Sequence, residues 1–492
     1  MKLITKKINP QILKLARRLV KQQPQSQVFL VGGPVRDLIL GKKCKDYDLL
    51  VRNIRPKKLE ALLNSWGKVN LVGKNFGVFK FQTSDIKYQV DIALPRTEHS
   101  IDQTGGYKDF KVQTNYKLSI NDDLSRRDFT INALAYDLIN DQLIDPFDGL
   151  KDIEKKTIRA VGKPNLRFAE DYSRLLRAIR FASQLNFKIE PKTWLAIKKL
   201  AKNINNRNSG EFIVPRETIA KELLKSFYTN PLETLNLLDK SGLLKQLIPE
   251  LLKMKGCPQP ANWHSEGDVW QHTILCLKNL ISTRYKKKFP NQPSINLIMS
   301  VILHDIAKPT TIKTPQKHGS DRIRFNEHDV LGGQKAKEIC QRLKLNSYKD
   351  ENIDCNDDAV AWLAKNHMLA VHGPIAQIKN TTLEKYFFSD KPGDDLLQLL
   401  FLDGISTIPQ KGEVYINHFQ QLNKRVQQLS KLRKNKKQTL PKPLLNGDQI
   451  MQLAKLPPSP KVGKFINLLR EEQLKKKITS VTQAKKFIKK LK

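Results

Sequence analysis

The sequence has few acidic residues, few aromatic residues and few cysteines for its length. Asp and Glu together number 48 against 87 Lys and Arg, so the formal net charge is +39, and aromatic residues make up 7% of the 492 residues. Such a basic excess favours a polyanionic partner, because cationic side chains neutralise phosphates and release counterions. A lysine-rich but ordinary solvated surface is the alternative. We favour a nucleic acid, since basic residues also crowd the motifs described below.

The cysteines argue against a disulfide framework. They are odd in number, scattered and without CxxC spacing: Cys44, Cys257, Cys276, Cys340 and Cys355. Long apolar stretches are also missing, since none reaches the length needed to span a bilayer, and the start of the sequence lacks a signal peptide's apolar core. We therefore expect reduced thiols in a cytoplasmic protein with no membrane partner.

The pattern of apolar residues changes once along the chain. A basic amphipathic helix is predicted within residues 1–25, and from about 26 to 160 short apolar runs alternate with turns and helical segments. Farther on, helical periodicity dominates, with breaks at the Pro-rich residues 256–260 and the Lys-rich residues 431–437. We expect an α+β fold, in which a mixed sheet with helices (1–160) is followed by helical domains at 161–255, 256–430 and 431–492.

A pair of glycines interrupts the first apolar run. Val28–Val31 indicates a buried strand, Gly32 and Gly33 break it, and Val35–Leu40 indicates a short helix ending at Gly41. Glycines let a phosphate approach the backbone closely, and a helix start offers free N–H groups. The motif therefore predicts a phosphate cradle.

Carboxylates follow the cradle. Asp46 and Asp48 lead into the apolar run Leu49–Val51, and residues two apart on a strand point to the same side. Two carboxylates beside a phosphate suit Mg²⁺ and indicate phosphoryl or nucleotidyl transfer. Asp91, on a later strand-like run, is either a third carboxylate of this group or a solvent-facing aspartate at a sheet edge, and its sequence context favours neither.

Two polar segments come next. Residues 97–119 contain Gly105 and Gly106 and predict a mobile loop, too long for a simple hairpin turn, which more often signals function than accident. Arg126 and Arg127, beside Asp128, would open an amphipathic helix and present guanidinium groups to a triphosphate or ribose. A capped surface helix would show the same pattern.

A helical segment farther on carries Asp171, Arg174, Arg177 and Arg180 at three-residue spacing. Asp171 and Arg174 would share a helix face. An ordinary salt bridge explains that pair and is the favoured interpretation for the pair alone. An acceptor and a donor held together could also pair with the Watson–Crick edge of a base, as a protein template for choosing nucleotides.

In this order, the segments resemble the class II tRNA nucleotidyltransferase and bacterial poly(A) polymerase family over residues 26–255. The resemblance rests on Gly32–Asp37, Asp46–Asp48, Arg126–Ala133 and Glu170–Phe181. It implies a nucleotidyltransferase palm followed by helical neck and body segments. Pro34 stands where similar proteins commonly have a small residue.

The resemblance also implies roles for individual residues. Asp46 and Asp48 would hold Mg²⁺, and Asp91 stays a catalytic candidate on its sequence context alone. Nucleotide contacts fall to Gly32, Gly33, Arg36 and Arg127, base reading to Asp171 and Arg174, and triphosphate or neck contacts to Arg177 and Arg180. The implied reaction is template-free addition of C, C and A to the 3′ end of tRNA from CTP and ATP by two-metal chemistry. In similar enzymes a polar loop, here about residues 98–115, supports the switch from C to A.

Six possible metal ligands lie in the third predicted domain. They are His272, His304, Asp305, His328, His367 and Asp403. Imidazole and carboxylate together suit divalent transition metals. The order resembles an HD-type phosphohydrolase domain, with Ala307 where Gly is common, and implies a site for Ni²⁺, Mn²⁺, Fe²⁺ or Co²⁺ and phosphatase or 2′,3′-cyclic phosphodiesterase activity. A vestigial site is the alternative.

Two other functions remain open from the sequence. An A-adding tRNA nucleotidyltransferase or a poly(A) polymerase would share the palm motifs. An RNA-binding HD phosphohydrolase with an inactive palm is a further candidate, although intact Asp46 and Asp48 argue against it. The basic residues 431–492 resemble the closing segment of many bacterial nucleotidyltransferases, and would contact the tRNA elbow or complete the HD fold.

Overall fold

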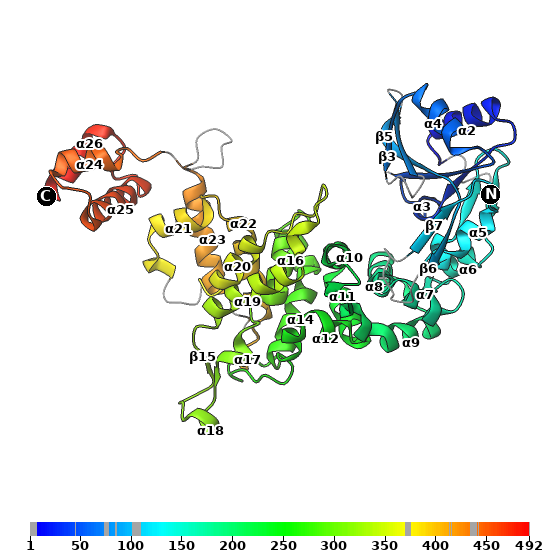
Figure 1. Cartoon of the computed structure of the whole chain (residues 1–492). Helices are drawn as coiled ribbons and strands as arrows, with labels where there is room; N and C mark the ends of the chain where they lie inside the picture. The colour runs from blue at the N-terminus through cyan, green and yellow to red at the C-terminus, as the bar shows by residue number, and fades with distance from the viewer. Residues whose placement is uncertain are drawn as a thin grey trace. The chain divides into compact units, whose positions relative to one another are not determined.

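The computed structural model forms two compact units, one ending at Leu247 and the other starting at Ile248 (Figure 1). It describes residues 7–44, 46–72, 78–83, 86–100, 110–369, 375–412, 414, 416–432, 440 and 442–491. Of the four domains expected from the sequence, the one at 161–255 crosses the boundary between these units, and the four-domain division stays a prediction. Among the described residues, no helix is both long and apolar enough to cross a membrane.

A seven-stranded mixed sheet dominates the start of the first unit, as the α+β expectation requires. Its order is β3-β4-β5-β2-β1-β8-β9. The strands are β1 (Gln27–Val31), β2 (Tyr47–Arg52), β3 (Lys68–Val72), β4 (Val78–Thr83), β5 (Ile86–Ala93), β8 (Ala135–Asp137) and β9 (Gln142–Ile144). The associated helices are α2 (Pro10–Gln22), α3 (Gly33–Ile39) and α4 (Pro56–Asn64).

The centre of the sheet carries the two sequence motifs. β1 pairs antiparallel with β2, and Leu30 lies opposite Leu49 in a fully apolar layer. β2 pairs parallel with β5, which places Asp48 directly opposite Asp91. Because β5 lies between β4 and β2, Asp91 is on an interior strand. The interpretation of Asp91 as an edge residue is therefore wrong.

Two parts of the polar segment expected as a loop at 97–119 are strands. β6 (Arg96–Ser100) and β7 (Phe110–Thr114) pair antiparallel as a two-stranded ribbon, with Thr97 opposite Gln113. Backbone pairing does not need apolar side chains, so a polar strand pair gives little sequence signal. Residues 101–109 lie outside the described part of the chain.

The two arginines that were expected to open a helix instead follow one. α5 (Ile120–Ser125) begins at a capping box, in which Ser119 and Asp122 bond each other's backbone N–H groups. Arg126 ends this helix, and the chain continues into the short 3₁₀ helix η2 (Thr130–Asn132) and then α6 (Gly149–Glu154). Asp122 in the first turn is the signal for the start.

Helices make up most of the remainder of the first unit, as the periodicity predicts. They are α7 (Pro164–Glu170), α8 (Ser173–Leu185), α9 (Pro191–Leu200), η3 (Ala201–Asn205), α10 (Arg216–Thr229), α11 (Pro231–Ser241) and α12 (Leu243–Leu247). Two small strand pairs interrupt them: β10 (Thr157–Ile158) with β11 (Lys188–Ile189), and β12 (Arg207–Asn208) with β13 (Glu211–Phe212).

The second unit is helical apart from one small strand pair in its described residues, β14 (Ile312–Lys313) with β15 (Arg324–Phe325). Its first helices are α13 (Pro249–Leu252), α14 (Val269–Leu280), α15 (Thr283–Lys288), α16 (Ile295–Leu303), α17 (Lys308–Thr311), α18 (Pro315–His318), α19 (His328–Arg342) and η4 (Leu345–Ser347). They are followed by α20 (Asp357–Asn366), η5 (Ile375–Gln377), α21 (Asn380–Phe387), α22 (Gly393–Ser406) and α23 (Asn417–Ser430).

Three further helices end the chain: α24 (Gly447–Ala454), α25 (Pro460–Leu474) and α26 (Val481–Lys490). They enclose an apolar core of their own that includes Ile450, Phe465 and Ile488. Arg470 on α25 pairs with Glu384 on α21. The closing segment is therefore a small helical bundle tied to α21 by a partly buried ion pair.

Candidate nucleotide and metal sites

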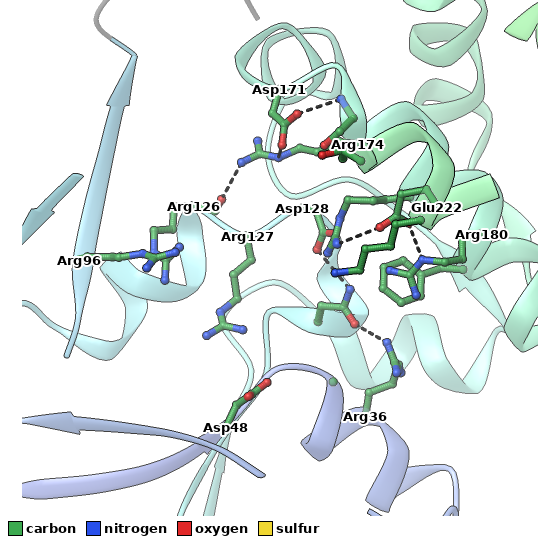
Figure 2. A pocket seen from close by; sticks show the side chains of 17 residues that line it. Arg36, Asp48, Arg96, Arg126, Arg127, Asp128, Asp171, Arg174, Arg180 and Glu222 are labelled. Atoms are coloured by element: carbon green, nitrogen blue, oxygen red, sulfur yellow. Dashed lines mark hydrogen bonds and ion pairs between the residues drawn. The ribbon is translucent and has the colours of Figure 1, made fainter. Parts of the chain in front are cut away.

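A cavity of about 700 Å³ lies in the first unit, between the motifs of the sheet and the helices α8 and α10 (Figure 2). Seven arginines and one lysine line it together with four carboxylates. The cationic side chains are Arg36, Arg96, Arg126, Arg127, Arg174, Arg177, Arg180 and Lys221, and the carboxylates are Asp48, Asp128, Asp171 and Glu222. This excess of cationic groups suits a polyanion such as a nucleoside triphosphate.

Gly32 lies in close contact with the side chain of Arg127. Gly32 has a φ of 77°, in the left-handed region, and an added Cβ would lie 2.5 Å from Nη1 of Arg127. Its N–H donates to the carbonyl of Leu134 at 2.9 Å. Gly33, which lines the cavity, has open space at its Cβ position up to Arg36 Nη2 at 3.7 Å. Glycine at position 32 thus lets the Arg127 guanidinium lie on the turn.

Asp48 lines one end of the cavity and has two neighbouring carboxylates, Asp46 and Asp91. Asp48 and Asp91 are partners across parallel strands, and Asp46 and Asp48 are both exposed while Tyr47 between them is buried. Although Asp48 is exposed as a residue, partial burial of its carboxyl group in the cavity wall raises the pKa of Asp48 to about 6; Asp91 and Asp46 add to the rise and Arg127 opposes it. This mutual repulsion is what a bound divalent cation would relieve, so the three side chains fit a metal.

Asp123 holds Arg126 and Arg127 in place. Asp123 on α5 is fully buried and binds Arg126 Nη2 at 2.8 Å and Arg127 Nη2 at 3.2 Å. The two arginines outweigh burial and hold the pKa of Asp123 below its ordinary value. Asp123 therefore orients both guanidinium groups toward the cavity, a role that sequence reasoning missed.

A second network fixes the arginines of α8. Arg177 donates from Nε and Nη2 to Asp128 at 2.8 and 2.6 Å, and Arg180 pairs with Glu222 on α10 (Figure 2). Burial raises the pKa of Asp128, but Arg177 and Asn132 overcome it and lower that pKa to about 2. Glu222 lies on α10 (Arg216–Thr229), and its spacing in the sequence carries no sign of this contact.

Asn132 links this network to the glycine motif. Its Oδ1 accepts from Arg36 Nη1 at 2.7 Å, and its Nδ2 donates to Asp128 Oδ1 at 3.2 Å. Position 132 lay within the recognised segment 126–133 without an assigned role. Arg96, another lining residue, comes from β6, which sequence reasoning took for a loop.

The expectation that Asp171 and Arg174 share a helix face is wrong. Asp171 lies between α7 and α8 in an extended conformation, and its carboxylate accepts from the N–H of Ser173 at 2.8 Å. Aspartate favours such positions because its side chain competes for backbone N–H groups. Arg174 on α8 nonetheless brings Nε to 4.0 Å from Asp171 Oδ2, and both side chains line the cavity.

The Arg174 guanidinium already has partners. Nη1 donates to Glu170 Oε2 at 2.5 Å and to the carbonyl of Arg167 at 2.8 Å. Nη2 reaches the carbonyl of Arg126 at 3.4 Å. A base contacting Arg174 would therefore meet a guanidinium that is held in a fixed orientation.

The six expected ligands of the second unit all converge. His272 lies on α14, His304 and Asp305 follow α16, His328 begins α19, His367 follows α20, and Asp403 lies on α22. Asp305 Oδ1 lies 3.5 Å from His367 Nε2 and 3.6 Å from His328 Nε2, and its Oδ2 lies 3.3 Å from His304 Nε2. Asp403 Oδ1 lies 3.1 Å from His272 Nε2. Asp305 thus stands between two groups of histidines.

Backbone carbonyls orient three of these imidazoles. The Nδ1 atoms of His304, His328 and His367 lie 3.0, 2.7 and 2.6 Å from the carbonyls of Val301, Phe325 and Ala364. This contact selects the tautomer that keeps the Nε2 lone pair for the centre. In the described part of the chain, Nε2 of His304 and of His328 is buried and has no hydrogen-bond partner. Buried acceptors in this state fit a metal ion.

The fourth imidazole is oriented by a carboxylate. Glu266 Oε1 lies 2.9 Å from His272 Nδ1 and 2.6 Å from His264 Nδ1, and its Oε2 accepts from the N–H of Ile408. Burial lowers the pKa of His328 to about 4, with His367 contributing. A histidine that stays neutral at pH 7 can bind a metal through its lone pair.

A cavity of about 810 Å³ opens onto this cluster. Its walls include Asp305, His328, His367 and Asp403, together with the half-exposed Trp263. Lys308 also lines it, with Nζ 2.7 Å from Asp305 Oδ2. The cluster is therefore open to a substrate and has a cation beside it.

Family models place this chain in a class. Residues 28–159 match the poly(A) polymerase head domain, and residues 186–254 match the probable RNA- and SrmB-binding site of polymerase A. The head domain coincides with the sheet and the carboxylates, and the second match with the helices after α8. Fold and cavity together are those of a nucleotidyltransferase.

Sequence relatives narrow the class. A multifunctional CCA protein of Xylella fastidiosa is 34% identical over 323 residues, covering 64% of this chain and 70% of that protein. One from Shewanella denitrificans is 32% identical over 423 residues, covering 82% and 90%. The chain belongs to this family of CCA-adding nucleotidyltransferases.

Solved structures share the fold. The CCA-adding enzyme of Bacillus stearothermophilus in complex with CTP gives a TM-score of 0.62 at 20% identity, over 98% of this chain and 96% of that one. The Thermotoga maritima CCA-adding enzyme complexed with tRNA gives 0.60 at 19% identity, over 99% and 97%. At this identity the likeness shows the common fold.

Proposed function

We propose that the protein adds C, C and A to the 3′ end of tRNA from CTP and ATP, without a nucleic-acid template. The observation that carries the proposal is a single cavity that the Asp48 carboxylate of β2 and the arginines of α8 line from opposite walls, with Asp91 of β5 paired beside Asp48. Relatives of the same family carry the name CCA protein. Protein side chains at both ends of the cavity leave no need for a template strand.

The cavity suggests how each group acts. Asp46, Asp48 and Asp91 would hold Mg²⁺, which supplies an activated 3′-hydroxyl and stabilises the charge on the departing pyrophosphate. Arg127, oriented by Asp123, neutralises the triphosphate beside the glycine turn. These residues bind charge and set the direction of attack.

The opposite wall reads the base. Asp171 offers an acceptor and Arg174 a donor, and cytosine and adenine both carry an exocyclic amine beside a ring acceptor on their Watson–Crick edge. Ion pairs of the α8 arginines with Asp128 and Glu222 hold that wall rigid. A rigid donor–acceptor pair discriminates against bases with the reverse pattern.

Three tRNA substrates test this proposal: one that lacks the whole CCA end, one that lacks CA and one that lacks only the final A. Restoration of the full end on all three, from CTP and ATP, is the expected result. Extension of only the last tRNA, or long A tails, would indicate an A-adding enzyme or a poly(A) polymerase. Phosphate release without incorporation would indicate an RNA-binding phosphohydrolase with an inactive palm.

The histidine cluster supports a second candidate activity, metal-dependent hydrolysis of a phosphoester. The observation is that the buried Nε2 atoms of His304 and His328 face Asp305 without a hydrogen bond, beside an open cavity. Such a site would hold one or two divalent transition metals, of which Ni²⁺, Mn²⁺, Fe²⁺ and Co²⁺ suit imidazole and carboxylate. A metal there supplies a nucleophilic hydroxide at neutral pH.

Single substitutions separate the two activities. Asp48→Ala should abolish nucleotide incorporation and spare hydrolysis of phosphatase and 2′,3′-cyclic nucleotide substrates, and His304→Ala should do the reverse. Each variant is the control for the other, since both assays use one protein preparation. If Asp48→Ala extends tRNA at the normal rate, the proposed palm chemistry is wrong.

A further inference from the structure

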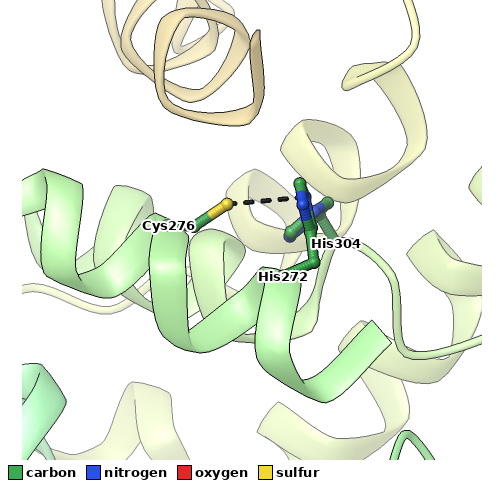
Figure 3. A group of neighbouring side chains, drawn as sticks. All are labelled: His272, Cys276 and His304. Carbon is green, nitrogen blue, oxygen red and sulfur yellow. Dashed lines mark hydrogen bonds between the residues drawn. The ribbon is translucent and has the colours of Figure 1, made fainter. Parts of the chain in front are cut away.

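One side chain beside the histidine cluster has no role in the proposed hydrolytic site. Cys276 lies one helical turn after His272 on α14, so both side chains project from the same face (Figure 3). The thiol is buried, and its Sγ is 3.5 Å from His272 Nε2. Sγ also lies 4.0 Å from the backbone carbonyl of Leu402.

An independent observation points to a ligand at the same place. His304 Nε2 is fully buried and makes no hydrogen bond among the described residues, although Asp305 Oδ2 lies 3.3 Å from it. The ligand atoms of His272, Cys276 and His304 all lie within 4.8 Å of one another, and the rings of His272 and His304 are 5.6 Å apart. Two imidazole nitrogens and a sulfur therefore surround one small buried volume.

The separation of the atoms matches ligands on one ion. A zinc-type ion binds imidazole nitrogen at about 2.0–2.1 Å and thiolate sulfur at about 2.3 Å, so at a tetrahedral angle the two atoms lie about 3.5 Å apart. The observed distance from Cys276 Sγ to His272 Nε2 is 3.5 Å. The pair needs no rearrangement to share a metal.

We propose that Cys276 is a thiolate ligand of the metal subsite formed by His272 and His304. This inference rests on the proposed metal site of the second unit. On binding, the S–H bond breaks, a metal–sulfur bond forms, and the proton passes to solvent. A soft sulfur ligand shifts the preference of this subsite toward Zn²⁺ and Co²⁺ and away from Mg²⁺ and Mn²⁺.

Cobalt is the probe that reports on sulfur directly. Metal-free full-length protein titrated with Co²⁺ should develop a sulfur-to-cobalt charge-transfer band in the near ultraviolet, together with visible ligand-field bands. Cys276→Ser should lose the charge-transfer band and keep the ligand-field bands. Cys340→Ser removes another buried thiol of the same unit, on α19, and should keep both.

Metal affinities give a second measurement. Cys276→Ser should weaken Zn²⁺ binding on the order of tenfold or more while changing Mn²⁺ binding much less. Cys276→Ala, checked by circular dichroism, repeats the test without a hydroxyl ligand. If Co²⁺ binds to the unaltered protein without a charge-transfer band, Cys276 is not a ligand. If no Co²⁺ binds to it at all, the proposed metal site itself fails.

Discussion

At the scale of single residues, most functional positions are set by one partner each. Gly32 leaves room for Arg127, Asp123 holds Arg126 and Arg127, and a backbone carbonyl turns His304 toward the cluster. The motif residue of such a contact, for example Gly32 or His304, can be recognised in the sequence. The partner is brought from elsewhere by folding.

Substitution of Gly32 tests the contact with Arg127. Gly32→Ala adds a Cβ 2.5 Å from Arg127 Nη1 and strains a residue with φ of 77°, so the arginine must move away from the turn. We expect the KM for CTP and ATP to rise and the unfolding free energy to fall by about 1–2 kcal/mol. Steady-state kinetics and urea unfolding measure the two effects.

Gly41→Ala is the matched control. Gly41 also has a positive φ, of 74°, but nothing lies within 4 Å of its Cβ position. It should share the loss of stability and leave the KM unchanged. Equal KM values for both variants would contradict the role assigned to the Gly32–Arg127 contact.

Acid should weaken the Asp128–Arg177 pair. The folded-state pKa of Asp128 is lowered to about 2, below an unfolded value of about 4. The stabilisation is therefore complete above pH 4 and is lost as the pH falls toward 2, with a magnitude of about 2 kcal/mol. The difference in urea unfolding free energy between the unaltered protein and Asp128→Asn should be constant above pH 5 and shrink below pH 4. A difference that stays constant down to pH 3 would show that Asp128 has an ordinary pKa.

At the scale of elements, the expectations that failed share a cause. The β6–β7 ribbon was taken for a loop because its strands are polar, and Asp171 was placed on a helix because helical periodicity runs through it. In each case hydrogen bonds to the backbone decide the element. The ladder between β6 and β7 forms the ribbon, and the N–H of Ser173 donates to the carboxylate of Asp171 between two helices. The periodicity of apolar residues reflects which side chains are buried and carries no information about these hydrogen bonds.

Breaking the ribbon tests its part in nucleotide choice. Thr97→Pro removes a backbone donor from the β6 strand, where Thr97 pairs with Gln113. If the ribbon supports the switch from C to A, addition of the two C residues should persist while addition of the final A falls. Gel analysis of tRNA that lacks CCA and of tRNA that lacks only A measures both steps, with Thr97→Val as the control. An equal loss of both steps would instead show a general effect on the fold.

At the scale of the whole molecule, charge is the dominant property. The chain has 87 Lys and Arg against 48 Asp and Glu. Part of this excess of positive charge lines the arginine-rich cavity of the first unit. The small bundle α24–α26 carries further lysines, among them Lys485, Lys486, Lys489 and Lys490. The bundle has an apolar core of its own, and Arg470 also ties it to α21.

Binding of tRNA should depend steeply on salt. Each phosphate neutralised by a cationic side chain releases counterions, so the logarithm of the binding constant should fall linearly with the logarithm of the salt concentration. Filter binding from low to moderate KCl measures the slope. Deletion of residues 442–492 should make the slope shallower if the bundle contacts tRNA, and an unchanged slope would exclude such contacts.

The sequence by itself determined the class of chemistry. Gly32-Gly33, Asp46-x-Asp48, the arginine segments and the ordered histidines are local patterns, because each requires residue types at fixed short spacings. The α+β division follows from periodicity for the same reason. These features survive in the sequence since they depend on neighbours along the chain.

Only the tertiary structure decided which side chains meet. Parallel pairing of β2 with β5 put Asp91 opposite Asp48, and packing of α8 on α10 gave Arg180 its partner Glu222. The position of Cys276 beside His304 depends equally on folding, since the two residues come from different helices. Contacts between distant segments follow from strand order and helix packing, which no short spacing encodes.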